Sequence, residues 1–272
     1  MKRKLSSEKT RLFLYFFFIA LLGSILLSLP QAYKSGISVN YIDALFTSVS
    51  AICVTGLSTL SMEIFSRTGL IFILILIEAG GLGILTYISF LMTVSSKKIS
   101  VVNGNLIKDF YIDDIDYNPK SILKKVVLFT LLIQAVGSIL LVPGLYKAGD
   151  QHFIFNSIFL SISAFCNAGF SPSPDSLASF SDNSYVLSII MCLIILGGIG
   201  FVVFTNVAQK IKFARKGQNF YLSLHVKIVL ISTAVLIIAG FAFTFFSFYK
   251  TSLWDTGFQD ICKVRFPFPL HS

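Results

Sequence analysis

The chain has 272 residues, of which 55% are hydrophobic and only 13% are charged. Soluble domains carry about 25% charged residues, so this composition excludes an ordinary soluble protein and indicates a chain that crosses a membrane several times. The net charge of +9 does not indicate nucleic-acid binding, because the basic residues are grouped between apolar runs. The four cysteines lack metal-ligand spacing and indicate small buried side chains rather than a zinc or disulfide framework: Cys53, Cys166, Cys192 and Cys262.

The N-terminus combines a basic start, MKRK, with the apolar run 12–29. A signal peptide is one interpretation of this pattern. The run is longer than the roughly 7–15 residues of a signal-peptide core, and no clear cleavage site follows it. At about 1.5 Å per residue it extends about 27 Å, which crosses the hydrocarbon core. We therefore expect a retained transmembrane helix.

Four further apolar runs are long enough to cross a membrane. They cover residues 69–94, 126–142, 185–208 and 228–248. The polar segments between the five runs differ sharply in their content of lysine and arginine, which gives a test of topology.

Residues 1–11, 95–125 and 209–227 hold 16 of the 22 lysines and arginines. The segments 30–68 and 143–184 hold only three, which are Lys34, Arg67 and Lys147. Cytoplasmic loops collect basic residues, so the first group is expected inside and the second outside. The sequence therefore predicts a multi-pass protein of the cytoplasmic membrane with a cytoplasmic N-terminus.

The stretch SVSAICVTGLST, residues 48–59, is too polar and too short for a comfortable span. If residues 44–57 crossed the membrane, the basic segment 95–125 would lie outside, against the positive-inside rule. An apolar stretch of this length is more often re-entrant than spanning. Backbone that leaves a helix at membrane depth must line water or be buried in protein. We expect residues 44–57 to dip into the membrane and return.

This segment is repeated later in the chain. Residues 46–58, FTSVSAICVTGLS, match 159–171, FLSISAFCNAGFS, at seven of thirteen positions. GSILL occurs at Gly23 and again at Gly137, and GGLG at Gly80 is matched by GGIG at Gly197. Three landmarks at nearly one spacing indicate an internal repeat. Both units start and end in the cytoplasm, so an axis along the membrane normal can relate them.

The predicted fold class is an all-α polytopic membrane protein built from units of helix, re-entrant helix with loop, and helix. The first unit is residues 1–100, with spans 12–29 and 69–94 and the re-entrant segment 44–57. A cytoplasmic linker follows at 101–125. The second unit is 126–208, with spans 126–142 and 185–208 and the re-entrant segment 156–170. Residues 209–249 form a linker and the first helix of an incomplete third unit, and 250–272 form an atypical tail.

The re-entrant segments are the candidate ion site. A short helix descending over residues 43–52 presents the partial negative charge of its C-terminal end, which favours cations. The next four residues are expected to climb back in extended form, with Gly56 permitting unusual backbone angles. Rings of carbonyl oxygens can replace the hydration shell of a monovalent cation. The predicted filter residues are Cys53, Val54, Thr55, Gly56, Cys166, Asn167, Ala168 and Gly169.

Three other residues inside the apolar runs are candidates for a function. Gly83 and Gly200 belong to glycine clusters for which close helix packing is the favoured interpretation and a hinge in the pore-lining helix the alternative. Glu78 is the only acid within a long apolar run. It is expected to face the protein interior or water. Hydrogen bonding to neighbouring backbone is the favoured role, and attraction of cations near the pore the alternative.

Several motifs in the expected order resemble the membrane subunit of the Trk/Ktr/HKT family of potassium-uptake proteins. They are ALFTSVSAICVTGL, SISAFCNAGFSP, GGLGILT, LIILGGIGFVV and LSLHVKIVL, and the similarity runs from about residue 12 to about 248. The resemblance implies four units around one pseudo-fourfold pore, with one essential glycine per filter, which matches Gly56 and Gly169.

The start of the chain is most similar to the Ktr branch of that family. The Ktr resemblance implies a homodimer on a cytosolic ring of nucleotide-binding regulatory subunits. It also implies transport of K+ coupled to Na+, with no cofactor bound by the membrane subunit itself.

The chain departs from the family in its C-terminal part, because after Trp254 no third filter motif follows. The expected function is uptake of potassium or other monovalent cations. The alternative is a truncated, non-conducting chain or an assembly subunit that needs a partner for the missing units. An enzyme is not expected, because the spans hold no histidine and no Ser-His or Asp-Asp pairing.

Overall fold

A computed structural model of the chain describes residues 2–37, 39–99, 119–215, 217 and 221–250. Over these ranges it consists of eight α-helices and three short 3-10 helices, without a β-strand. The expected all-α class is confirmed. The predicted linker up to residue 118, the predicted tail from residue 251 and Cys262 lie outside the described residues.

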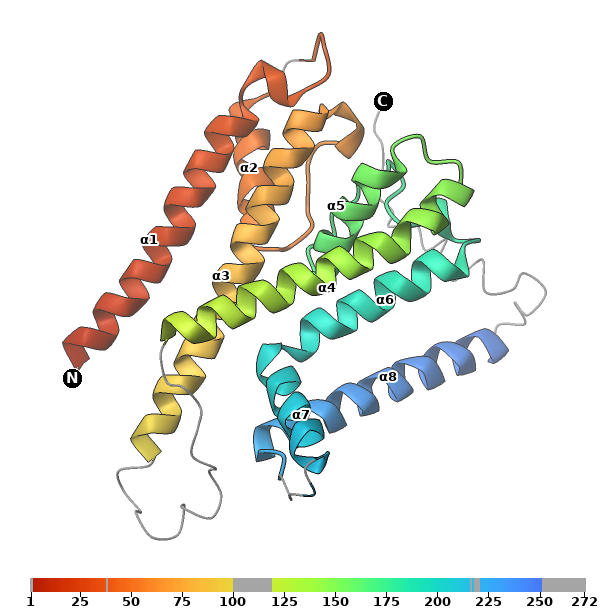
Figure 1. The fold of residues 1–272 in the computed structure, drawn as a ribbon. Helices are drawn as coiled ribbons and strands as arrows, with labels where there is room; N and C mark the ends of the chain where they lie inside the picture. The colour runs from red at the N-terminus through yellow and green to blue at the C-terminus, as the bar shows by residue number, and fades with distance from the viewer. Residues whose placement is uncertain (1, 38, 100–118, 216, 218–220, 251–272) are drawn as a thin grey trace.

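The first unit has two long helices with a short one between them (Figure 1). Helix α1 (Lys2–Leu27) leads through a 3-10 turn at Pro30–Ala32 to the short helix α2 (Tyr41–Ile52). An irregular return loop and a second 3-10 turn, Met62–Ile64, connect α2 to α3 (Arg67–Ile99). Helix α2 packs against both long helices.

The second unit repeats this order. Helix α4 (Pro119–Lys147) begins inside the predicted linker and is followed by the short helix α5 (Phe153–Phe165). A return loop with a 3-10 turn at Ala178–Phe180 leads to α6 (Ser184–Ile199). Helix α5 packs against both α4 and α6, which also pack against each other. Two further helices follow, α7 (Phe201–Ala214) and α8 (Leu224–Lys250).

Among the described residues, two helical stretches are long and apolar enough to cross a membrane, Lys124–Lys147 and Leu224–Phe246. A third candidate is the pair Ser184–Ile199 and Val203–Ala214, which is bent by 91°. The run 185–208, predicted to cross the membrane, is therefore divided between two helices that meet at an angle. The break falls at Gly200, whose φ of 85° and ψ of 150° are accessible essentially to glycine alone.

The outer loop of the first unit is closed by Tyr33 and Phe65. Their rings lie 5.1 Å apart between centroids, and the two residues form an isolated antiparallel bridge. Burial, and secondarily the negative charge of Asp43, raise the pKa of the Tyr33 phenol above its ordinary value. Both residues are buried, so the ring pair packs inside the unit and holds the segment after α1 against the segment before α3.

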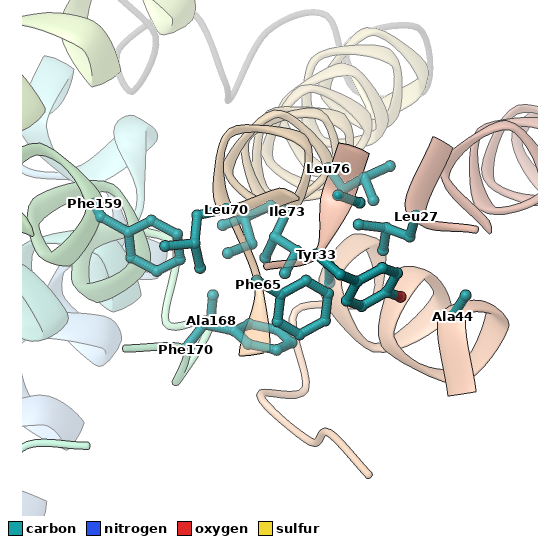
Figure 2. Close-up of a cluster of buried hydrophobic side chains, with 13 residues drawn as sticks. Leu27, Tyr33, Ala44, Phe65, Leu70, Ile73, Leu76, Phe159, Ala168 and Phe170 are labelled. Carbon is teal, nitrogen blue, oxygen red and sulfur yellow. The ribbon is translucent and has the colours of Figure 1, made fainter. Parts of the chain in front are cut away.

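The two units share one hydrophobic core, which Figure 2 shows. Leu70, Ile73 and Ile77 of α3 are buried, and the second unit contributes Phe159 from α5 and Phe170 from its return loop. Within a membrane such side chains hold helices together by close van der Waals packing rather than by removal from water. The second unit is therefore fixed against α3 at the level of its short helix and return loop.

Glycine makes the contact between each short helix and the long helix that follows it. A Cβ at Gly80 in α3 would overlap the carbonyl oxygen of Ile52, the last residue of α2. A Cβ at Gly197 in α6 would overlap the carbonyl oxygen of Phe165, the last residue of α5. The expectation that these glycine clusters permit close packing holds at both positions.

Replacing Gly80 or Gly197 by alanine is expected to lower the stability of the chain by about 1–3 kcal/mol, because the added methyl group must displace backbone. Gly198→Ala is the matched control, since a Cβ there meets no atom within 4 Å. The measurement is resistance to denaturant in detergent micelles. Equal losses at Gly197 and Gly198 would contradict the packing account.

Candidate ion-coordination site

The first short helix ends in a tight turn that begins at Cys53. Cys53 has a right-handed helical backbone conformation, and Val54 follows with φ of 58°. The amide of Thr55 donates to the carbonyl of Ser50 at 3.0 Å, and the amide of Val54 donates to that of Ala51 at 3.2 Å. These two bonds form a Schellman motif, which satisfies carbonyls at the helix end.

The second short helix ends in the same turn. Cys166 is right-handed, and Asn167 has φ of 58°. Ala168 donates to Ser163 at 2.8 Å, and Asn167 donates to Ala164 at 3.0 Å. The expectation that the loops climb back in extended form is therefore wrong for the first two residues of each. The Schellman motif prevails because it satisfies carbonyl groups that would otherwise be left without partners.

Backbone strain is concentrated at equivalent positions of the two loops. Asparagine tolerates the left-handed conformation of Asn167, but a β-branched residue such as Val54 adopts it only when its surroundings enforce it. Such residues cost about 1–3 kcal/mol and cluster at binding and switch sites. Gly56 and Gly169 are also left-handed, with φ of 72° and 74°. Positive φ thus occurs at the second and fourth residue of both loops.

A serine within each short helix braces the returning loop. Ser50 Oγ accepts a hydrogen bond from the amide of Leu57 at 2.8 Å and lies 2.8 Å from Thr55 Oγ1. Ser163 Oγ donates to the carbonyl of Phe170 at 2.6 Å. Both serines are buried, so these bonds hold the loop from its protein side.

A second serine anchors each short helix to the long helix before it. Ser48 Oγ donates to the carbonyl of Ala20 at 2.7 Å, and Ser161 Oγ donates to that of Gln134 at 2.8 Å. Gly23 faces the first serine. Gly137 faces the second at the equivalent place. The serines that make these stretches unusually polar in the sequence thus donate or accept the hydrogen bonds that fix the short helices and their loops.

The two loops come together at their glycines. A Cβ at Gly56 would lie 2.5 Å from the carbonyl oxygen of Ala168 and 3.0 Å from the Cα of Gly169. Cys53 and Thr55 are exposed, as are Asn167 and Gly169. The two predicted loops therefore lie backbone against backbone where Gly56 meets Ala168 and Gly169.

Glu78 accepts hydrogen bonds from two side chains, whereas backbone partners were expected for it. Gln134 Nε2 donates to Glu78 Oε2 at 2.9 Å, and Cys166 Sγ donates to the same oxygen at 3.8 Å. Sequence reasoning missed Gln134, although an amide in the apolar run 126–142 was an available signal.

Gly83 and Gly200, which were predicted together, occupy different settings. Helix α3 continues through Gly83 to Ile99, whereas Gly200 separates α6 from α7. The bend at Gly200 has the geometry of the hinge alternative. Gly83 lies within a continuous helix.

The outer ends of the two units meet at Arg67 and His152. Arg67 Nη2 lies 3.0 Å from His152 Nδ1, and its guanidinium stacks over the ring of Phe155 at 5.8 Å. Asp150 accepts the amide hydrogen of His152 at 2.8 Å. These contacts link the beginning of α3 to the beginning of α5.

Gly56→Ala is expected to lower the stability by clearly more than the roughly 1–2 kcal/mol that a left-handed alanine costs, because its methyl group meets the second loop. Gly36→Ala measures the cost of a left-handed alanine alone, since Gly36 has φ of 86° and a Cβ there meets no atom within 4 Å. Thermal unfolding in detergent compares the two variants. If both shift the midpoint equally, the two loops are not in contact.

Comparisons with known proteins agree with this architecture. A family model described as TrkH, cation transport protein, matches residues 3–261. The chain is 36% identical over 228 residues to the potassium/sodium uptake protein NtpJ of Enterococcus hirae, covering 83% of this chain and 49% of the relative. It is 36% identical over 238 residues to the Ktr system potassium uptake protein B of Vibrio alginolyticus, and the match covers 86% of this chain and 50% of that protein. The sodium transporter HKT1 of Arabidopsis thaliana is 29% identical over 194 residues, and the match covers 60% of this chain and 38% of that protein.

The chain spans about half the length of the curated relatives it matches. The family match extends over nearly all of the chain, and the helices are long and apolar. The family is one of cation transporters and not of enzymes. This chain is therefore a membrane protein and belongs to the TrkH cation transport protein family.

Proposed function

We propose that the chain takes up potassium or other monovalent cations across the cytoplasmic membrane. The ions are coordinated by backbone carbonyls of the two loops, residues 53–56 and 166–169. The observation that carries this proposal is the matched geometry of the loops. Both follow a Schellman turn, both have positive φ at their second and fourth residues, and they touch at Gly56 and Gly169.

The chemistry of the loops favours coordination of a monovalent cation by backbone oxygens. Neither loop contains an acidic side chain, so the carbonyls are the available ligands. The short helices α2 and α5 direct their C-terminal ends, with partial negative charge, at the start of each loop. Two negative helix ends near one point stabilise a cation there without binding it too tightly for release.

Assembly and coupling belong to the same proposal. The resemblance to the Ktr branch supports a homodimer, a cytosolic nucleotide-binding regulatory partner and coupling to Na+. The grouping of 16 of the 22 basic residues in three segments supports a cytoplasmic N-terminus.

Two units leave part of the ion site uncovered. In the second unit, Phe159 is fully buried against α3, whereas its counterpart Phe46 in the first unit is 41% exposed. Ile77 of α3 is fully buried, whereas its counterpart Ile194 of α6 is 40% exposed. The exposed face of α2 corresponds to the face of α5 that contacts α3. The exposed face of α6 corresponds to the face of α3 that contacts α5. Further units of the same kind are proposed to continue the ring from these faces.

The open faces also favour the second candidate function. A chain with two filters and two uncovered faces fits an assembly subunit, or a non-conducting piece, that needs a partner to complete the pore. The two candidates differ in whether this chain transports ions when it is expressed alone.

Rubidium uptake separates these candidates. The chain is expressed in cells that lack their own potassium-uptake systems, and its membrane insertion is verified. Transport by the chain predicts rubidium uptake that Gly56→Ser abolishes, because the added side chain occupies the contact between the loops. Gly149→Ser is the matched control, since Gly149 is also left-handed and a Cβ there meets no atom within 4 Å. Uptake that survives Gly56→Ser would refute the filter assignment, and absence of uptake from an inserted chain would favour the assembly subunit.

A further inference from the structure

A small polar cluster lies at the junction of the two units and includes the side chain of the first residue of the second loop. It consists of Glu78 on α3, Gln134 on α4 and Cys166 at the end of α5. Gln134 and Cys166 both donate to Glu78 Oε2, at 2.9 Å and 3.8 Å, and Gln134 Nε2 also lies 3.8 Å from Cys166 Sγ. Glu78 and Gln134 therefore both contact the first residue of the second filter loop.

Two buried oxygen atoms of this cluster have no hydrogen-bond partner. They are Glu78 Oε1 and Gln134 Oε1, and the Gln134 side chain is only 3% exposed. A buried acceptor without a donor is costly, and a buried carboxylate served only by neutral donors is more costly still. Glu78 also lies in an apolar helix, where an ionised acid requires water or a partner. The cluster therefore lacks one donor.

One hydrogen atom on Glu78 Oε1 supplies that donor. The two groups are already joined by the bond from Gln134 Nε2 to Glu78 Oε2, and a carboxylic acid and an amide can pair through two parallel hydrogen bonds. The same proton removes the charge from the apolar helix and gives Gln134 Oε1 its partner.

We propose that Glu78 is a neutral acid paired with Gln134, and that this pair is a positioning element that fixes Cys166 and stiffens the second filter loop. The first loop has no equivalent cluster among the described residues, because Ala20 stands in place of Gln134. In α6 the position that corresponds to Glu78 is held by the apolar Ile195. Cys53, the counterpart of Cys166, is exposed.

The consequence for ions rests on the proposed function. A stiff loop adapts its carbonyls less readily to ions of different size than a loose one. The second loop is therefore assigned the larger share of the discrimination between K+ and Na+. This assignment makes the two filters unequal, although their backbone turns are matched.

The first test measures how fast a maleimide labels Cys166 in the purified chain, with Cys53, Cys192 and Cys262 replaced by serine. Glu78→Leu and Gln134→Leu are each expected to accelerate labelling about tenfold, the effect of losing a hydrogen bond. Glu78→Gln is expected to leave the rate unchanged, since two amides can also pair doubly. Ile195→Ala is the matched control and should have no effect. Unchanged rates in both leucine variants would overturn the proposal.

The second test asks whether the pair does more than stabilise the fold. The midpoint of thermal unfolding is compared in KCl and in NaCl, with N-methylglucamine chloride as the reference. The parent chain and Glu78→Gln should show the same K+/Na+ difference, and Glu78→Leu a smaller one. If Glu78→Gln behaves like Glu78→Leu, Glu78 acts as an anion, and the neutral pair is wrong. If labelling rises but the K+/Na+ difference is unchanged, the role in selectivity is wrong.

These measurements do not depend on transport. A parent chain that shows no difference between K+ and Na+ would count against the proposed function and the selectivity role together. The labelling rates would still decide whether the pair positions Cys166. Infrared spectra give a separate readout of the proton, because the carbonyl band of a protonated carboxyl group should be lost in Glu78→Gln. A parent spectrum without that band would overturn the neutral acid.

Discussion

The rest of the ion site depends on one backbone contact, made once in each unit. The last carbonyl of the short helix lies directly against a glycine of the following long helix, Ile52 against Gly80 and Phe165 against Gly197. With the helix end fixed there, the chain must turn back at once, and the Schellman motif with its left-handed residue provides that turn. The strain at Val54 is sustained because the helix end and the serine brace on either side leave no relaxed alternative.

The two units are alike in backbone but different in surroundings. Ala168 and Phe170 of the second loop belong to the shared core and Cys166 contacts Glu78, whereas the first loop begins with an exposed cysteine. This difference follows from the head-to-tail order of the units, in which α3 of the first covers α5 of the second. Repeated units in one chain can therefore hold matching turns in non-equivalent surroundings.

Periodicity, charge and the internal repeat were enough to predict the helical class and a short helix that ends at Ile52. The assignment of the eight loop residues to an ion site stays a prediction. These patterns could not predict the turn at residues 53 and 54, because a Schellman motif usually carries glycine where this chain has Val54. The bend at Gly200 was also hidden, since Gly83 in the matching cluster lies in a continuous helix. The partner of Glu78 comes from another unit, and a single sequence gives no distance between residues 78 and 134.

The central claim is that a cation is held by the backbone of the two touching loops. Anomalous diffraction from crystals of the chain soaked in Tl+ or Rb+ tests it most directly, because these ions replace K+ and scatter strongly. The account predicts a peak beside the loops 53–56 and 166–169, within coordination distance of their carbonyl oxygens. A peak bound instead by Glu78 and Gln134, or no peak near Gly56 and Gly169, would contradict it.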